Sequence, residues 1–167
     1  LLFVLTQLIH SKPTQWNQFR GPNGDGDAGK ANLPIQFSET KNLTWKTPMP
    51  GKAWSSPVVR DGKVWITNAE EDGFKMWAIQ LDWKTGKPLK KVLVFENKEP
   101  QFCHPMNSYA TPTPVIVKNQ VFVHFGSHGT AALDANTGRK IWERRDFKCD
   151  HYRGAAASPI PHLDTLI

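Results

Sequence analysis

The sequence predicts an all-β protein built from repeated four-stranded antiparallel units, and three observations support this prediction. A turn motif around Asp134 recurs in a degenerate form around Asp82, 52 residues earlier. The strand-like segments on either side of the motif recur with it. No stretch of the sequence shows a sustained helical period with capping residues. Recurrence at this spacing indicates a repeat architecture, in which each unit buries its faces against its neighbours.

The turn motif is predicted to form a strand–turn–strand corner. Its clearer copy spans residues 132–142 and reads Ala-Leu-Asp-Ala-Asn-Thr-Gly-Arg-Lys-Ile-Trp, and its degenerate copy spans residues 80–87. The Asp carboxylate is suited to accept the N–H groups of the turn, and the Gly can adopt the positive φ that closes it. The residues assigned to this structural motif are Asp82, Thr85, Gly86, Ala132, Asp134, Thr137, Gly138 and Trp142.

Four strands are expected in each of two repeats, because short β-branched and aromatic runs alternate with turn residues. In the first repeat they lie at 55–59, 64–67, 75–81 and 88–95, with Asp61-Gly62 as a hairpin turn. In the second repeat they lie at 112–117, 121–125, 129–133 and 139–145. A third repeat begins at residue 157, and a leading strand at 43–47 resembles the outer strand of a repeat at 140–144.

Repeated four-stranded antiparallel units are the building blocks of a β-propeller, in which each unit forms one blade. A closed propeller takes about four to eight blades, whereas this sequence holds about two complete blades and the start of a third. We therefore expect an incomplete propeller at 43–167, either as part of a longer product or as a natural short one. Because both ends of the blade array are open, the chain is expected to associate or to unfold in part.

The spacing of the second corner resembles the repeat signature of pyrroloquinoline quinone-like (PQQ-like) β-propellers. Segments 16–24, 54–59 and 107–115 also resemble the N-terminal blades of secreted bacterial members of that family. The resemblance implies that Trp142 packs between adjacent blades. The first corner departs from the signature, since Gln80 stands where the family has Ala and Lys90 stands where it has Trp.

The resemblance implies functions of two different classes. One is a non-catalytic exported propeller that binds or scaffolds proteins, with recognition by loops at one rim. The other is the N-terminal part of a PQQ-dependent alcohol dehydrogenase, in which the protein holds PQQ beside Ca²⁺. The sequence shows no matching ligand set, no vicinal Cys-Cys pair and no paired acid and base motif, so the first function is favoured. No catalytic or cofactor-binding residue is assigned, and no cofactor is predicted outside the second function.

The two cysteines, Cys103 and Cys149, occupy comparable linkers after successive repeats. Equivalent inter-blade loops can meet on one face of a propeller, so the pair is a candidate disulfide, with two free thiols as the alternative. A Zn²⁺ site formed with His104 and His151 is a weaker candidate. Neighbouring Cys and His side chains in an extended segment rarely face one ion, and structural zinc sites usually separate their ligands further.

Two other patterns are interpreted as structural rather than as metal sites. Residues 23–27 alternate acidic residues with Gly, yet they lack the Glu that an EF-hand loop requires at its twelfth position. We expect this segment, within an irregular region at 16–42, to be a surface loop. His124 and His128 lie on a strand and in the turn that follows it, so their rings are not expected to converge.

Charge and hydropathy restrict the partners and the compartment. The formal net charge is +6, from 21 basic and 15 acidic residues. The basic residues are spread over corners and outer strands, where they are expected to deter edge-to-edge pairing rather than to bind nucleic acid. The apolar run at residues 1–9 is too short to span a bilayer. Region 1–15 is interpreted as the remnant of a secretory signal, with unrelated upstream sequence as the alternative. We expect a periplasmic or otherwise extracytoplasmic protein that has protein partners and no membrane span, and that contacts the remaining blades of a longer product.

Overall fold

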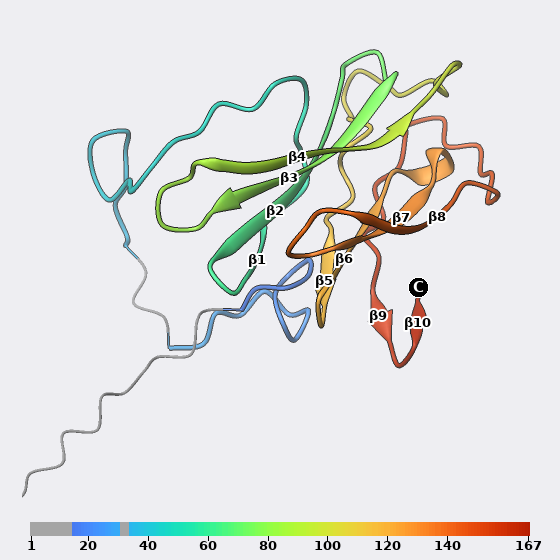
Figure 1. The fold of residues 1–167 in the computed structure, drawn as a ribbon. Coiled ribbons are helices and arrows are strands. Elements are labelled where there is room, and N and C mark those ends of the chain that lie inside the picture. The colour runs from blue at the N-terminus through green and yellow to red at the C-terminus, as the bar shows by residue number, and fades with distance from the viewer. Residues whose placement is uncertain (1–14, 31–33) are drawn as a thin grey trace, which may run out of the picture.

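A computed structural model describes residues 15–30 and 34–167 and confirms the all-β prediction (Figure 1). The apolar run at residues 1–9 lies outside the described residues. Two four-stranded antiparallel sheets follow one another along the chain, in the strand orders β1-β2-β3-β4 and β5-β6-β7-β8, and a two-stranded hairpin follows them. The first sheet, blade 1, consists of β1 (Val58–Arg60), β2 (Lys63–Ala69), β3 (Lys75–Asp82) and β4 (Pro88–Glu96). The second sheet, blade 2, consists of β5 (Val115–Val117), β6 (Gln120–His124), β7 (Thr130–Asp134) and β8 (Lys140–Arg144), and the hairpin consists of β9 (Pro161–His162) and β10 (Thr165–Leu166).

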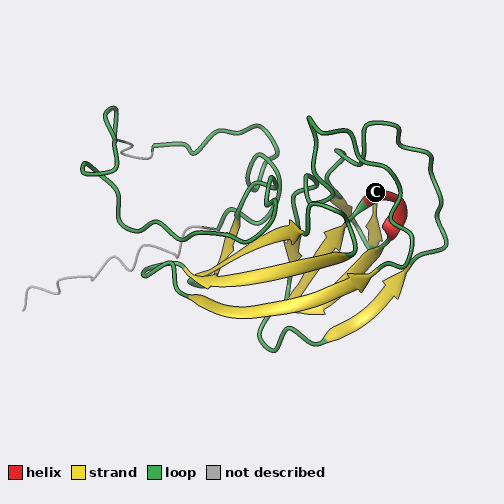
Figure 2. Cartoon of the chain, turned by 90° about the horizontal axis from the view of Figure 1, so that it is seen from above, coloured by secondary structure: helices red, strands yellow, loops and turns green. Residues whose placement is uncertain are grey.

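The blades are meanders of the same design, and one register irregularity occurs in both. The β3–β4 ladder shifts register between Gln80 and Leu81, and the β7–β8 ladder shifts between Ala132 and Leu133. These positions are equivalent, because each lies directly before a corner. The turn predicted after β6 is one turn of 3-10 helix, η1 (Gly126–His128). Viewed from above, the strands gather on one side of the molecule and the long loops on the other (Figure 2).

The main hydrophobic core lies between the two blades. Trp65 and Phe95 of blade 1 and Phe125 and Leu133 of blade 2 are at most 2% exposed. The Phe95 and Phe125 rings meet edge to face, with centroids 5.9 Å apart. Burial of these side chains is the main force holding the blades together, at about 2 kcal/mol for each large apolar residue.

A second apolar cluster covers the other face of blade 1. Its buried members include Ile66 and Ile79, and its cover comes from Trp16, Trp45 and Met49, which precede the blade in sequence. Blade 1 is therefore buried on both faces, as a propeller blade requires.

The prediction of a leading strand at 43–47 was wrong. The segment has no β-ladder in the described chain, because a strand requires a neighbouring backbone and this one has only side-chain contacts. Trp45 Nε1 donates a hydrogen bond to the Trp83 carbonyl at 2.9 Å, and Thr47 Oγ1 donates to the Gly86 carbonyl at 2.7 Å. The segment thus lies against the first corner without pairing with it.

A short strap near the start of the chain crosses the inner edges of both blades. Trp16 and Val59 of β1 exchange two backbone hydrogen bonds at 2.8 and 2.9 Å. The Asn17 carbonyl accepts a hydrogen bond from N of Ile116 in β5 at 2.8 Å, and its side-chain amide donates to the Ile116 carbonyl at 3.2 Å. Among the described residues, no helix has the length and apolar character needed to cross a membrane.

Candidate functional site

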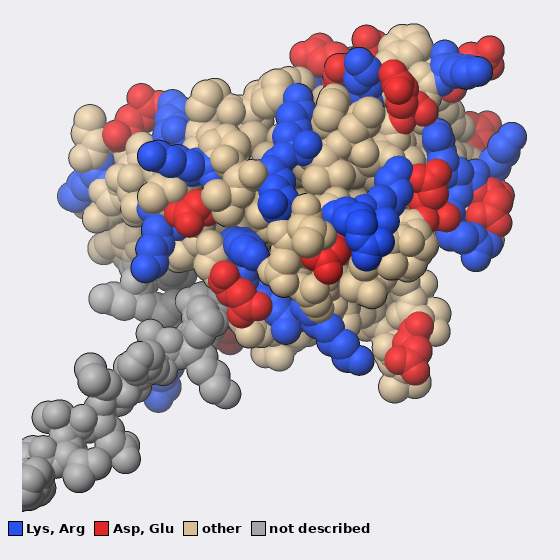
Figure 3. Space-filling view, in the orientation of Figure 1, with Lys and Arg blue, Asp and Glu red and all other residues tan. Residues whose placement is uncertain are grey.

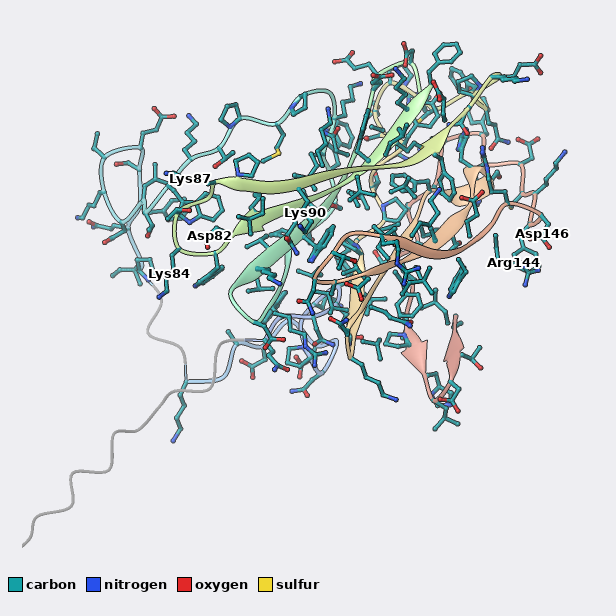
Figure 4. The ribbon with its side chains drawn as sticks, in the orientation of Figure 1. Asp82, Lys84, Lys87, Lys90, Arg144 and Asp146 are labelled. Atoms are coloured by element: carbon teal, nitrogen blue, oxygen red, sulfur yellow. The ribbon has the colours of Figure 1, made fainter. Side chains whose placement is uncertain are left out.

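The first corner (corner 1, residues 82–87) is held by one carboxylate. Asp82 Oδ1 accepts hydrogen bonds from N of Lys84 at 3.1 Å and from both N and Oγ1 of Thr85 at 2.8 Å. N of Gly86, whose φ is 67°, donates to the Asp82 carbonyl at 2.8 Å. Figure 4 shows Asp82 within the corner, between Lys84 and Lys87. The carboxylate thus organises the turn, as predicted.

The second corner (corner 2, residues 134–139) has the same bonds. Asp134 Oδ1 accepts from N of Asn136 at 3.0 Å, and from N and Oγ1 of Thr137 at 2.7 and 2.9 Å. The Thr137 hydrogen bonds lower the pKa of the Asp134 carboxyl below its ordinary value. Those of Thr85 lower the pKa of Asp82 in the same way. Both carboxylates are engaged by the N–H and O–H groups of their own corners.

Each corner is contacted by the part of the chain that precedes its blade. The contact is made at the corner glycine and at one backbone carbonyl of the corner. At corner 1, the Trp45 ring covers Gly86 so closely that a Cβ there would lie 2.4 Å from the ring. Its indole N–H donates to the Trp83 carbonyl. Trp45 therefore fills the role that the repeat signature gives to Trp142, although its segment is not a strand.

Corner 2 is docked without a tryptophan. Gln80, which is 1% exposed, donates from Nε2 to the Ala135 carbonyl at 2.8 Å, and this carbonyl is equivalent to that of Trp83. Lys90 and Val92 cover Gly138, at 3.2 and 2.9 Å from a Cβ placed there. Gln80 and Lys90 are cross-strand partners, as are Ala132 and Trp142 in blade 2. The two departures from the signature, Gln80 and Lys90, thus form a matched pair that stands where blade 2 has Ala132 and Trp142. Sequence analysis identified both departures but not their pairing.

Trp142 lies in a groove between blade 2 and the β9–β10 hairpin. It is 37% exposed, its ring centroid lies 5.9 Å from that of Phe122, and Asp164 and Leu166 of the hairpin line the same groove.

Hydroxyl groups connect the inner ends of successive repeats. N of Ser56 donates to Thr113 Oγ1 at 3.1 Å, and N of Thr113 donates to Ser158 Oγ at 3.0 Å. Each of these residues precedes a proline. Sequence analysis missed this series, although the repeated Ser/Thr-Pro pairs were a usable signal.

The blade-connecting loops meet at the rim opposite the corners. Arg145 donates from Nε to the His128 carbonyl at 2.9 Å and from Nη1 to the Glu96 carbonyl at 3.3 Å, and it also contacts Asn97 Oδ1. His128 Nε2 accepts from N of Gln101 at 3.1 Å. Arg145 therefore ties the end of blade 2 to the end of blade 1.

The two histidines of blade 2 do not converge on a shared partner. His124 Nδ1 lies 2.8 Å from Thr130 Oγ1, whereas His128 contacts Gln101 and the Phe125 carbonyl. Burial lowers the pKa of both imidazoles, which favours their neutral forms.

The loops that carry the cysteines do meet, and both cysteines are free thiols in the structure. Gln101 Nε2 donates to the Cys149 carbonyl at 3.3 Å, and Cys103 Sγ lies 3.9 Å from the Arg153 carbonyl. Burial raises the pKa of the Cys103 thiol. The Cys103–Cys149 disulfide remains a prediction.

The Zn²⁺ candidate of Cys103, His104, Cys149 and His151 is not assembled. Within residues 15–30 and 34–167, no three His, Cys, Asp or Glu side chains gather as a metal site. His104 Nδ1 instead accepts a hydrogen bond from N of Met106 at 3.1 Å, so the ring serves its own turn.

A pocket lies beside the inner ends of the blades. Its lining includes Phe19, Arg20, Trp54, Ser56 and Thr113, and contains no carboxylate. A Ca²⁺ ion that polarises PQQ requires oxygen ligands, usually carboxylates. The described residues of this pocket therefore do not fit a PQQ and Ca²⁺ site.

Comparison with known proteins places the chain among propellers. The family model described as "Outer membrane protein assembly factor BamB" matches residues 29–148. No curated protein gives a significant match.

Three solved structures are among those that match the chain. Alignment with quinohemoprotein alcohol dehydrogenase ADHIIG from Pseudomonas putida HK5 covers 73% of this chain and 17% of that one, at 19% identity and a TM-score of 0.48. Alignment with BamB from Moraxella catarrhalis covers 75% of this chain and 49% of that one, at 14% identity and a TM-score of 0.42. Alignment with a europium-containing methanol dehydrogenase covers 53% of this chain and 14% of that one, at 25% identity and a TM-score of 0.36. The chain spans less than half the length of each of these structures.

Proposed function

Because the chain belongs to the PQQ-like propeller family of the outer membrane protein assembly factor BamB, we propose that it is a non-catalytic, exported propeller module whose rim loops bind other proteins. The family match over residues 29–148 carries this proposal. In this function the module is a rigid scaffold that presents loops to its partners, outside the cytoplasm.

The use of the signature residues supports this proposal. Asp82 and Asp134 are engaged by their own corners, and Gly86 and Gly138 lie under docking side chains. These residues build blades and leave recognition to the segments between them. The two connecting loops carry exposed apolar side chains suited to partner contact, among them Phe102 at 58% and Met106 at 82% exposure.

Site-specific photo-crosslinking tests the proposal in the full chain. A photoreactive amino acid at Phe102 should give one discrete adduct with a protein of an extracytoplasmic extract, and mass spectrometry should identify the same partner in replicate preparations. The control position is Ile35, which is 98% exposed but lies in the irregular N-terminal segment. Equal, heterogeneous labelling from both positions would contradict the proposal.

A second arm addresses the alternative of a PQQ-dependent oxidoreductase. The chain is incubated with PQQ and Ca²⁺, passed through gel filtration, and examined for retained cofactor absorbance and for dye-linked alcohol oxidation. We expect neither signal. Stoichiometric PQQ with alcohol oxidation would overturn the non-catalytic function.

A further inference from the structure

The turns at the corner end of the blades form a continuous basic surface. We call it the basic corner rim and define it by Lys63, Lys84, Lys87, Lys90, Lys118 and Arg139. All of these side chains are exposed except those of Lys63 and Lys90, which are half-buried. In the space-filling view, Lys and Arg lie across the middle of the molecule over both blades, with fewer Asp and Glu among them and others toward the upper and right edges (Figure 3).

Contacts between the blades show that this rim is one surface rather than two separate corners. Lys63 lies opposite Asp82 in the β2–β3 ladder, beside corner 1, and its Nζ donates to Asn136 Oδ1 of corner 2 at 2.8 Å. Asn136 in turn donates to Asn119 Oδ1 at 2.9 Å, next to Lys118. Lys90 reaches from β4 over Gly138. The cations of blade 1 are thereby placed beside those of blade 2.

The cations of the rim lack acidic partners. Four salt bridges occur in the described part of the chain, and none includes a residue of the basic corner rim. The nearby carboxylates are otherwise engaged: Asp82 and Asp134 are bonded within their corners, and Asp61 pairs with Arg60. The six cations of the rim outnumber Asp82 and Asp134, so the rim keeps a net positive charge. Such a charge attracts an oppositely charged partner and raises its association rate.

Protection of open sheet edges does not explain this charge. Lysines on an outer strand block edge-to-edge pairing, and Lys90 on β4 fits that role. Lys84, Lys87, Lys118 and Arg139 instead lie in turns, which present no strand edge. Edge protection therefore accounts for Lys90 but not for these four residues.

Trp83 adds an apolar anchor at one end of the rim. It is 46% exposed and shares a shallow depression with Trp45 and Lys84. Its backbone is held by the Trp45 indole hydrogen bond, so the ring is presented from a fixed turn. Corner 2 has Ala135 at the equivalent position, so the packing of the repeat does not require the large ring. Tryptophan is enriched among the residues that dominate protein-binding energies.

We propose that the basic corner rim binds an acidic segment of a partner protein, with glutamate or aspartate side chains along the lysines and an apolar side chain against Trp83. This inference rests on the proposed protein-binding function and adds a second binding surface to it, at the rim opposite the connecting loops. A single aromatic beside spaced lysines does not suit nucleic acid, whose binding uses several stacking rings, or a bilayer, whose binding uses a wider apolar face.

Fluorescence anisotropy on the full chain tests the proposal. The probe is a fluorescein-labelled peptide of sequence Glu-Glu-Leu-Glu-Glu-Leu-Glu-Glu. We expect saturable binding at low salt that weakens about tenfold when the salt concentration rises to physiological values or above. K84E/K87E should weaken binding at least about tenfold, and K118E/R139E should have a similar effect. W83A should weaken it by a smaller factor at every salt concentration.

The matched control is K98E/K148E, which makes the same charge change with exposed lysines of the opposite rim. It should leave the affinity within about twofold. Equal weakening in control and rim variants, or no saturable binding, would overturn the proposal. So would tighter, rim-dependent binding of phosphatidylglycerol vesicles or single-stranded DNA. If the peptide does not bind but Phe102 gives a discrete crosslink, the rim proposal is refuted and the proposed function stands. PQQ-dependent activity would refute the proposed function.

Discussion

Corner 1 and corner 2 have the same internal hydrogen bonds, yet different residues dock on them. A tryptophan covers Gly86 and donates to the Trp83 carbonyl at corner 1, whereas at corner 2 a lysine and a valine cover Gly138 and a glutamine donates to the Ala135 carbonyl. The repeat therefore requires an N–H donor for that carbonyl and a cover for that glycine. Tryptophan supplies both from one residue, whereas blade 1 divides them among several.

The largest expected effect comes from filling the two corner glycines. Gly86→Ala places a Cβ 2.4 Å from the Trp45 ring at a left-handed φ of 67°. Strain of about 1 kcal/mol and overpacking of about 2 kcal/mol should together lower the free energy of unfolding by about 3 kcal/mol. Gly138→Ala meets the Val92 and Lys90 side chains at the longer distances of 2.9 and 3.2 Å and should cost about half as much. Urea unfolding measures both, and equal losses would show that docking at the two corners is not different.

The role of Gln80 can be tested by restoring the signature. Gln80→Ala leaves the Ala135 carbonyl without its donor and should cost about 2 kcal/mol. Adding Lys90→Trp should recover most of this loss, because the new indole can donate to Ala135 as Trp45 does to Trp83. The single Lys90→Trp variant should be destabilised. In blade 2 the partner of Trp142 is the small Ala132, whereas in blade 1 the larger Gln80 would lie beside the new ring. Additive effects in this double-mutant cycle would refute the matched pair.

A smaller effect is expected from the hydroxyls at the inner ends. Thr113→Val removes the acceptor for N of Ser56 inside the interface between the blades and should cost about 1 kcal/mol. Ser158→Ala removes the equivalent acceptor for N of Thr113 beside the hairpin, where the residue is half-buried, and should cost less. Thermal melts compare the two interfaces directly. A larger loss in Ser158→Ala would reverse their ranking.

Acid should weaken both corners together. The pKa of Asp82 and that of Asp134 lie below the ordinary value of 3.8. Their stabilising contribution is therefore present above pH 3.8 and is lost as the pH falls through the lowered folded-state values. Urea midpoints should drop below about pH 4, and D82N/D134N should show a shallower drop. Identical pH profiles for the wild type and this variant would contradict the role of the two carboxylates.

The sequence was sufficient to predict the features that depend on local chemistry. Asp134, Thr137 and Gly138 specify a corner within a few residues, and Asp61-Gly62 specifies a hairpin, so both were found. The segment at 43–47 has the composition of a strand but no adjacent backbone, so the strand prediction was wrong.

The docking pair was beyond a reading of the sequence for a physical reason. Gln80 and Lys90 lie ten positions apart, and only the β3–β4 register makes them neighbours. The basic corner rim also depends on tertiary placement, since Lys63 reaches corner 2 from the other blade. In the sequence, these cations appear only as scattered charge.

The strap formed by Trp16 and Asn17 has a consequence for the order of folding. Each blade is a meander of short-range hairpins, but Asn17 meets its partner Ile116 across 99 residues. Loop closure over that separation carries an entropic cost that is offset only once β1 and β5 are already in place. The strap should therefore close last during synthesis and open first under stress. The amides of Val59 and Ile116, which donate to the strap, should therefore exchange hydrogen together and faster than the amides within the blades.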